Sequence, residues 1–356
     1  MTRNDRDPLP WPCVVLFDID GVLVDVRPSY HQVIVDTVTA YLQQILGWPV
    51  PDGVVDHKHV AVLKRVGGFN NDWNTVAAML HVLVAHLPPS PSPQAGTPEA
   101  VRAAAASLAC LPDLTARLRR AADHLLALEA PARAQGGGLK AVRSLLNDHN
   151  AHLVLYPEPL TPEANIIVRL YQERYLGAEL FQEVHHLPPR FHHGPGLIDA
   201  ECPLIPQEIL ATLAKHVPLG LVTGRPRMEA VYALKRLNYW PYFRVLVSHD
   251  EVVAEMRRRN TREPLGKPHP WPLRQAADTL DPDGRLPVVF FGDTVDDVHA
   301  TIRLREWRPA VAVGCTWAYE DRSAAAAHLR AAGADRIVHR PEAIPALWNM
   351  LPRHNI

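Results

Sequence analysis

Short apolar runs alternate with helical patterns in two separate parts of the chain. The first run, VVLF at residues 14–17, has the length and β-branched content of a strand buried on both faces. Similar runs follow at residues 219–222, 243–247, 287–291, 310–313 and 336–338. Stretches with helical spacing separate these later runs, and strands that alternate with helices predict a parallel sheet with right-handed crossovers. The pattern therefore predicts an α/β domain whose first strand lies far from the others in the sequence.

The stretch between these two parts has a different, helical pattern. Apolar residues recur near helical spacing from Tyr30 to Ile45, and a further helical stretch at 162–176 is expected to end at Gly177. Residues 88–98, PPSPSPQAGTP, predict a Pro/Ser-rich linker. We therefore expect a helical domain at 27–199, inserted into an α/β domain at 1–26 and 200–356. An insertion after the first strand would lie over the ligand crevice, where it can close as a lid.

Composition narrows the functional classes. The 356 residues allow more than one domain, and 47% hydrophobic and 21% charged residues are ordinary for a soluble globular protein. A net charge of −1 gives no sign of nucleic-acid binding, and no stretch approaches the roughly 20 apolar residues of a membrane span. The four cysteines lie far apart without a CxxC pair, which fits a reducing compartment. We therefore expect a cytoplasmic protein without nucleic-acid or membrane partners.

Two aspartates follow the first predicted strand. Asp18 and Asp20 are two residues apart, so both side chains can point to the same side of an extended chain, and Gly21 then allows a turn. In an open α/β sheet the carboxyl ends of the strands face the ligand crevice. The pair is either a solvated turn or a carboxylate nucleophile beside a carboxylate acid/base, next to a divalent cation.

Polar residues in three later segments match this chemistry. Thr223 and Gly224 follow the strand at 219–222, Asp293 and Asp297 follow the strand at 287–291, and Lys267 lies in the segment between them. Taken singly, Thr223 could cap a helix, Lys267 could be an exposed loop lysine, and Asp297 could favour a helix dipole. Because parallel strands bring their carboxyl ends to one edge, we expect these groups to meet in one crevice.

The segments LFDIDGVLVD, LVTGR, GKPHP and VVFFGDTVDD together resemble the four motifs of the haloacid dehalogenase-like (HAD) superfamily, in the same order. The resemblance covers residues 13–25 and 204–315. It implies a Rossmann-like parallel sheet core, and the inserted stretch resembles the family's helical cap of the C1 type. At about 175 residues, the insertion is much longer than a simple four-helix cap of about a dozen residues per helix would need.

The resemblance implies catalytic roles for individual residues. Asp18 would be the nucleophile that attacks phosphorus and forms an aspartyl-phosphate. Asp20 would protonate the leaving alcohol and then activate the hydrolytic water. Thr223 would donate a hydrogen bond to a phosphoryl oxygen, Lys267 would neutralise the nucleophile and the phosphate, and the backbone amide of Gly224 could contribute to a small anion nest.

The resemblance also implies a magnesium site. Asp293, together with Asp18 and the backbone carbonyl of Asp20, would hold Mg²⁺, and Asp297 would orient or supplement the metal shell. The physical need is independent of the family, because an ionised carboxylate cannot approach a phosphate dianion unless cations offset the repulsion. Mg²⁺ prefers hard oxygen ligands such as these.

An acid at the position of Asp20 distinguishes the family members that cleave phosphoesters from those that cleave carbon–halogen bonds. Members that cleave a carbon–halogen bond lack an acid at this position, because a halide needs no proton. The sequence therefore predicts a phosphatase of the phosphoglycolate-phosphatase-like branch, acting on a small phosphorylated metabolite. A phosphomutase on the same core, or a non-catalytic binding or regulatory protein on this scaffold, are the alternatives.

The substrate's leaving group would be read by the helical insertion. The segment GGFNNDW at 67–73 is either a helix–helix turn with a capping residue or a loop that touches substrate. The candidate substrate-reading residues are Lys64, Arg65, Asn70, Asn71, Asp72 and Trp73. The sequence leaves open which metabolite is bound and whether the protein is a monomer or a homodimer.

Overall fold

The computed structural model describes residues 9–69 and 71–348, which form two compact units. An α/β unit comprises the chain up to Val26 and from Glu201 onward, and a helical unit comprises Arg27–Ala200. This division falls one residue after the boundary expected at 199/200. Within the described ranges, no helix is both long and apolar enough to cross a bilayer.

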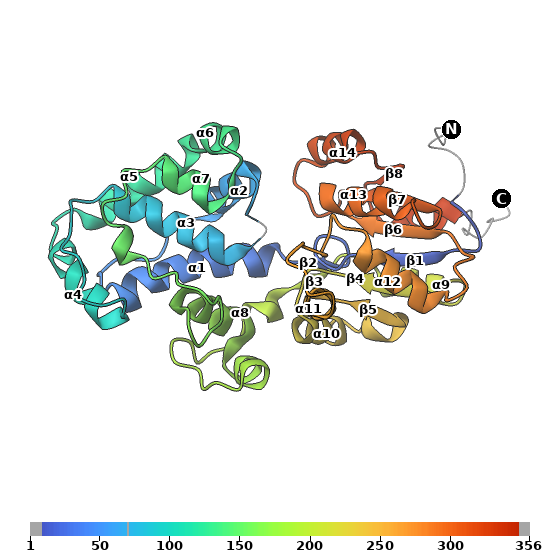
Figure 1. Ribbon diagram of the computed structural model, residues 1–356, viewed down its shortest axis with the longest axis horizontal. Coiled ribbons are helices and arrows are strands. Elements are labelled where there is room, and N and C mark those ends of the chain that lie inside the picture. The colour runs from blue at the N-terminus through green and yellow to red at the C-terminus, as the bar shows by residue number, and fades with distance from the viewer. Residues whose placement is uncertain (1–8, 70, 349–356) are drawn as a thin grey trace. The chain divides into compact units, whose positions relative to one another are not determined.

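A six-stranded parallel sheet forms the centre of the α/β unit (Figure 1). Its strands, in spatial order, are β5 (Val245–Val247), β4 (Leu219–Val222), β1 (Val14–Phe17), β6 (Val288–Gly292), β7 (Ala310–Cys315) and β8 (Arg336–Val338). The predicted parallel α/β fold is confirmed. The strand expected to start at residue 243 begins two residues later, because Trp240–Tyr242 form a 3₁₀ turn that precedes it.

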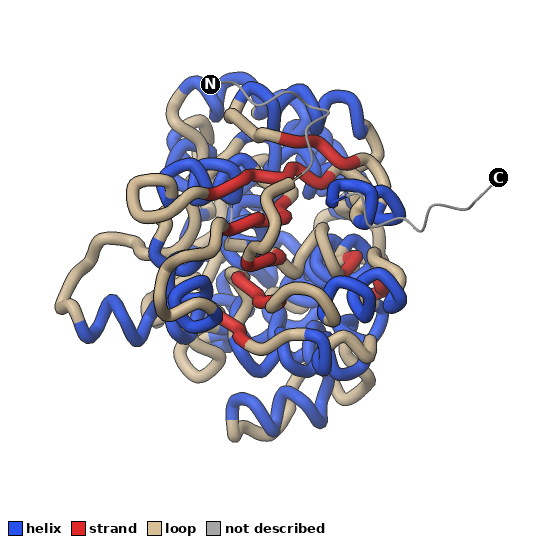
Figure 2. Tube along the Cα trace, turned by 90° about the vertical axis from the view of Figure 1, so that its right-hand side faces the viewer, coloured by secondary structure: helices blue, strands red, loops and turns tan. Residues whose placement is uncertain are grey.

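Alternate residues of β1 point into two different cores, so helices cover both faces of the sheet. Val15 and Phe17 pack in the core that contains α9 (Gln207–Ala214) and α10 (Arg227–Arg236). Val14 and Leu16 pack in the core of α12 (Trp271–Leu280) and α13 (Val295–Leu304). The other α-helices that the structure describes in this unit are α11 (His249–Arg258) and α14 (Arg322–Ala331). Figure 2 shows most of the strands, in red, one below another. A strand buried on both faces explains why the run VVLF is continuously apolar.

The strand order places a crevice at β1. The chain goes from β1 to β4 and β5 on one side, and then crosses to β6, β7 and β8 on the other side. In doubly wound sheets, ligands bind at the carboxyl ends of the strands where the order reverses. Here that point lies beyond Phe17, whose register partners are Leu221 in β4 and Phe291 in β6. Beyond it, a small antiparallel ribbon pairs β2 (Val24–Asp25) with β3 (Cys202–Pro203).

The helical unit packs around α3 (Asp72–Ala85), of which residues 75–84 are all buried. The other α-helices that the structure describes in this unit are α1 (Gln32–Ala40), α2 (His57–Val66), α4 (Pro98–Ala109), α5 (Leu114–Ala127), α6 (Glu129–Ala134), α7 (Gly138–Ser144) and α8 (Ile166–His185). They run from blue to green in Figure 1. The expected linker at 88–98 ends where Thr97 caps α4.

A helical segment ends at Gly177, as expected, but a second segment follows it directly up to His185, so α8 consists of two segments that meet at a kink. Gly177 has a φ of 76°, and a Cβ there would lie 2.3 Å from the backbone nitrogen of Gly196. Glycine is therefore required at this position by both its φ angle and the close approach of a second chain segment. The helical segments before and after Gly177 therefore meet at a kink.

Candidate active site

Asp18 directly follows β1 and is the residue around which the site is built. Its backbone N–H donates to the carbonyl oxygen of Phe291 at 2.9 Å, so the pairing with β6 continues past the last residue of β1. Its Oδ1 accepts the N–H of Ile19 at 2.8 Å, and the side chain is buried. The carboxylate is thus fixed at the carboxyl edge of the sheet, as the sequence predicted.

Lys267 brings a positive charge to this carboxylate from the segment before α12. Its Nζ lies 2.9 Å from Oδ2 of Asp18 and 2.6 Å from Oδ1 of Asp297. The same ammonium lies 5.6 Å from the ring centroid of Phe290, which is part of β6. Lys267 is therefore a largely covered partner of two carboxylates, and the alternative of an exposed loop lysine is wrong.

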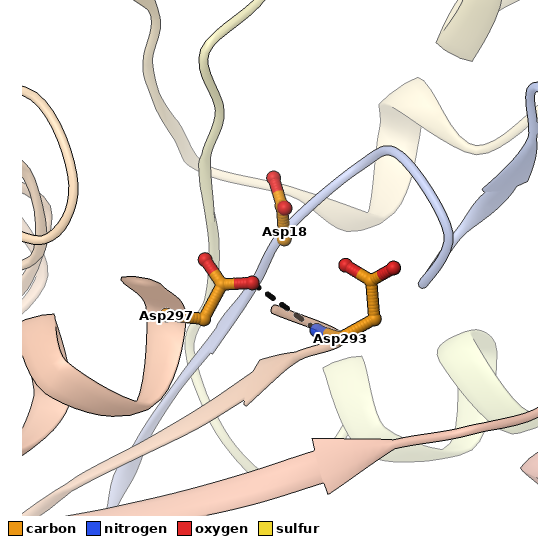
Figure 3. A group of neighbouring side chains, drawn as sticks. All are labelled: Asp18, Asp293 and Asp297. Carbon is orange, nitrogen blue, oxygen red and sulfur yellow. Dashed lines mark hydrogen bonds between the residues drawn. The ribbon is translucent and has the colours of Figure 1, made fainter. Parts of the chain in front are cut away.

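Asp18, Asp293 and Asp297 gather at the same edge of the sheet, as Figure 3 shows. One carboxylate oxygen from each of the three lies within 4.8 Å of the others. Asp297 arranges the group, because its Oδ2 accepts the backbone N–H of Asp293 at 3.1 Å and of Thr294 at 3.0 Å. The side chains of Thr294 and Asp297 also form a capping box at the start of α13. Asp297 thus favours the helix start and also orients the site.

The site carries more negative than positive charge, and the pKa values reflect this. Burial, and then the carboxylate of Asp297, raise the pKa of Asp18 to about 7, while Lys267 acts in the opposite direction. Burial also raises the pKa of Asp293 well above its usual range, and Asp297 and Asp18 add to this. For Lys267, burial disfavours the charged form, but Asp18 and Asp297 outweigh it and raise the pKa. Such a cluster is stabilised by a further cation.

The donor set fits a hard divalent cation. Oδ1 of Asp293 is buried and has no hydrogen-bond partner among the residues that the structure describes. Gly21 leaves room beside it, because a Cβ at this residue, which has a φ of 72°, would lie 2.2 Å from Oδ2 of Asp293. Carboxylate oxygens are the ligands that Mg²⁺ prefers. Asp18, Asp293 and Asp297 could therefore hold a metal ion.

The side chain of Asp20 does not join this group of three. Its Oδ1 accepts a hydrogen bond from Nε of Arg225 at 2.5 Å. The two terminal nitrogens of Arg225 donate to the two carboxylate oxygens of Glu201, at 2.9 and 3.0 Å. Neither Arg225 nor Glu201 was expected at the site from the sequence. The arginine of the LVTGR segment was the available signal, because it lies two residues after Thr223.

Thr223 and Gly224 lie at the carboxyl end of β4. The backbone N–H of Thr223 donates to Val247 at 3.0 Å, and its Oγ1 accepts the N–H of Arg225 at 3.1 Å. Helix α10 begins only at Arg227, so Thr223 is not its N-cap. The hydroxyl hydrogen of Thr223 is left to donate elsewhere. At Gly224, no described atom lies within 4 Å of the place where a Cβ would be.

Tyr319 is a further neighbour of the acidic group that sequence reasoning missed. Its hydroxyl donates to the backbone carbonyl of Asp293 at 3.0 Å. The side chain is exposed as a whole, but desolvation of its hydroxyl, and then the nearby Asp293, raise the pKa of this phenol, so it remains a donor at neutral pH. No motif marks this tyrosine, which follows β7 in the sequence.

The candidate substrate-reading residues lie around the start of α3 in the helical unit. Asn71 caps this helix, since its Oδ1 accepts the N–H of Trp73 at 2.8 Å. Asp72 accepts from Nζ of Lys64 at 2.5 Å and from the hydroxyl of Tyr171 at 2.9 Å. The capping role expected for Asn71 or Asp72 is therefore filled by Asn71.

The other candidates of this segment have partners in the same unit or lie outside the description. Nε of Arg65 lies 3.0 Å from Oε2 of Glu129 in an exposed ion pair. The ring of Trp73 meets that of Tyr171 edge to face, with centroids 6.5 Å apart. Asn70 lies outside the described residues. A substrate-reading role for this segment stays a prediction.

Comparison with known proteins agrees with this geometry. A family model described as haloacid dehalogenase-like hydrolase matches residues 14–303. The phosphoglycolate phosphatase of Escherichia coli strain K12 is 32% identical over 100 residues, which cover 28% of this chain and 34% of that protein. The match therefore spans about a third of the length of this relative.

Two solved structures share the fold. An X-ray structure from a structural genomics consortium has a TM-score of 0.61 at 19% identity, covering 95% of this chain and 99% of that one. Phosphatase Tt82 from Thermococcus thioreducens has a TM-score of 0.52 at 21% identity, covering 84% of this chain and 91% of that one. At these identities the similarity shows the fold alone.

Proposed function

The chain belongs to the haloacid dehalogenase-like hydrolases, and from this premise we propose that it is a Mg²⁺-dependent phosphatase of small phosphorylated metabolites. The observation that carries the proposal is the pairing of Asp18 with Lys267 beside Asp293 and Asp297. This arrangement supplies a nucleophile, a fixed positive charge and oxygen ligands for a cation. The curated relative named phosphoglycolate phosphatase supports the same class of reaction.

In the first half of the reaction, a carboxylate oxygen of Asp18 attacks the phosphorus atom. The ammonium of Lys267 offsets the charge of the nucleophile and of the incoming phosphate. The Thr223 hydroxyl and the Gly224 amide donate to phosphoryl oxygens. Asp20 gives its proton to the leaving oxygen, so that an alcohol departs and the phosphoryl group remains on Asp18.

In the second half, Asp20 takes a proton from water, which attacks the phosphorus of the aspartyl-phosphate. This step releases inorganic phosphate and regenerates Asp18 and protonated Asp20. Mg²⁺, held by Asp18, Asp293 and the carbonyl of Asp20, would neutralise phosphoryl oxygens when it is bound. Asp297 keeps the backbone of Asp293 in place through the hydrogen bonds described above.

The helical unit would act as a cap that selects the leaving group. Lys64, Asn71 and Asp72 are the residues proposed to read it, with Arg65 and Asn70 beside them in the sequence. The carboxylate of Asp72 is held between Lys64 and Tyr171, so its position is fixed by two hydrogen bonds. Unchanged kcat/KM for the physiological substrate in both Asn71→Ala and Asp72→Ala would assign the segment a purely structural role.

Phosphate release from a panel of phosphorylated metabolites tests the function. The assay compares wild type with Asp18→Asn, each with Mg²⁺ and with EDTA. We expect metal-dependent turnover by the wild type only, and the ranking of substrates then begins to define the cap. Absence of turnover by folded protein that binds Mg²⁺ would contradict the proposal. Turnover that survives Asp18→Asn would contradict the assigned nucleophile.

A further inference from the structure

Arg225 connects the acid/base carboxylate to a buried glutamate. Its Nε donates to Oδ1 of Asp20 at 2.5 Å, and its two terminal nitrogens donate to Glu201 at 2.9 and 3.0 Å. The side chain of Arg225 is 1% exposed and that of Glu201 is fully buried. This fork-to-fork geometry fixes the guanidinium plane, because both hydrogen bonds must be kept at once.

The backbone of Arg225 is fixed as well. Its N–H donates to Oγ1 of Thr223, and its carbonyl accepts the N–H of His249 at 3.0 Å. Glu201 is the first residue of the α/β unit after the chain returns from the helical unit. Asp20, Thr223 and Glu201 are therefore linked through one residue, Arg225, although they lie in separate segments of the sequence.

The charges indicate what this link does. Glu201 neutralises the guanidinium, so the pair as a whole brings no net charge to Asp20. The side chain of Asp20 keeps 30% exposure, so one carboxyl oxygen is held by Arg225 while the carboxyl group stays accessible. Proton transfer requires the acid to lie within hydrogen-bond distance of the oxygen atom that it protonates. A fixed orientation of the carboxyl group therefore favours the transfer.

We propose that Arg225, fixed by Glu201, is the positioning residue for the acid/base Asp20. This inference rests on the proposed phosphatase function. As the bond between phosphorus and the leaving oxygen breaks and the bond to Asp18 forms, Asp20 gives its proton to the leaving oxygen. Arg225 aims the carboxyl group at that oxygen throughout, and it does so again when Asp20 takes a proton from water in the second half.

The chemistry of the leaving group separates this role from a merely structural one. A 4-nitrophenolate departs readily without a proton, whereas a phenolate depends more on a general acid. If the carboxyl group of Asp20 is no longer oriented toward the leaving oxygen, cleavage of phenyl phosphate should therefore slow more than that of 4-nitrophenyl phosphate. Partial misfolding lowers both rates equally, and so does loss of a contact to the phosphate. The parameter to compare is kcat/KM, because it reports the steps up to departure of the phenol.

The test uses Arg225→Met combined with Glu201→Gln, so that removal of the arginine leaves no unpaired buried carboxylate. The second variant is Arg225→Lys, which keeps the positive charge but cannot form the paired hydrogen bonds to Glu201. The control is Arg227→Met, because Arg227 is a nearby arginine whose ion pair with Glu251 is exposed. Each variant is assayed as full chain with both aryl phosphates, and also in the Asp20→Asn background.

We expect both Arg225 variants to widen the ratio of kcat/KM between the two esters by about tenfold or more, because general acid–base catalysis contributes roughly 10²–10⁴-fold. In the Asp20→Asn background the same changes should leave the ratio unaltered. Equal loss for both esters, or a further change of the ratio without Asp20, would overturn the proposal. Wild-type turnover of 4-nitrophenyl phosphate that is lost in Asp18→Asn tests the phosphatase function separately.

Discussion

Nζ of Lys267 lies 2.9 Å from Oδ2 of Asp18, and this contact joins the third and first sequence motifs within the protein interior. The same ammonium also holds Asp297 at 2.6 Å. One lysine therefore offsets part of the charge of two buried carboxylates. Burial, and then the carboxylate of Asp297, raise the pKa of Asp18 to about 7 even beside a lysine, so a further cation would stabilise the cluster.

Lys267→Met should remove most of the activity. Without the ammonium, Asp18 and the phosphate repel each other, and loss of one such electrostatic group costs about 10²–10³-fold in rate. The measurement is kcat/KM with 4-nitrophenyl phosphate, and Lys235→Met serves as the control because Lys235 is exposed. Activity within a few-fold of wild type for Lys267→Met would show that this contact has no catalytic importance.

Gly21→Ala should impair metal binding more than stability. A Cβ at residue 21 would lie 2.2 Å from Oδ2 of Asp293, so the carboxylate must move. Gly53→Ala is the matched control, because Gly53 also has positive φ, at 78°, but no described atom lies within 4 Å of its Cβ position. Both variants bear the backbone cost of about 1 kcal/mol.

The two glycine variants are compared by the Mg²⁺ concentration that gives half-maximal activity and by thermal unfolding. Only Gly21→Ala should need more Mg²⁺ than the wild type. The same Mg²⁺ requirement in both variants would contradict the placement of Asp293 in the metal site.

That the core residues meet at one edge of the sheet could be predicted from the sequence for a physical reason. Asp18, Thr223 and Asp293 directly follow apolar strands, and a parallel sheet brings such positions to one edge whatever the sequence separation. Arg225, Glu201 and Tyr319 were missed because their contacts depend on tertiary structure. Glu201 precedes a two-residue strand, and Tyr319 lies in a loop without a motif.

The helical unit was harder to predict in detail. Its helices were expected from apolar spacing, but spacing does not say which segments pack together, and the kink at Gly177 depends on the approach of Gly196. The segment 67–73 left capping and substrate contact open. The structure assigns the capping to Asn71, while the kinetic role of the segment remains a prediction.

Asn71 offers a way to separate the two roles. Asn71→Ala should lower the free energy of unfolding by about 1 kcal/mol, because the N–H of Trp73 loses its acceptor. Asn71→Asp should keep the cap and the stability, but it removes the amide hydrogens that could contact a substrate. The experiment measures chemical unfolding and kcat/KM for both variants. If Asn71→Asp matches the wild type in both, Asn71 serves the helix alone.

His59 should make the helical unit less stable in acid. Burial lowers the pKa of this imidazole. Asp56 opposes this effect, Lys58 adds to it, and Asp123 opposes it less strongly. Its Nδ1 accepts the backbone N–H of Asp56 at 3.0 Å, which requires the neutral ring. Because the folded-state pKa lies below the unfolded value of about 6.5, this stability is complete above that pH and is lost as the pH falls.

The acid sensitivity is tested with His59→Gln, since glutamine at this position can keep the capping box without titrating. The unfolding temperature is compared at neutral pH and below pH 6. The decrease of the unfolding temperature in acid should be smaller in His59→Gln than in the wild type. In His193→Gln, where the side chain is exposed, the decrease should equal that of the wild type. An equal decrease in all three proteins would contradict the role of His59.

The most direct test of the central claim is to trap the phosphoryl group on the enzyme. The full chain with Mg²⁺ is mixed with 4-nitrophenyl phosphate, quenched in acid within the first turnover, and its peptides are analysed by mass spectrometry. We predict a phosphoryl group on Asp18, its absence in Asp18→Asn, and its accumulation in Asp20→Asn, because water attack then lacks its base. Steady turnover without a phosphorylated Asp18, or with the phosphoryl group on another residue, would contradict the account.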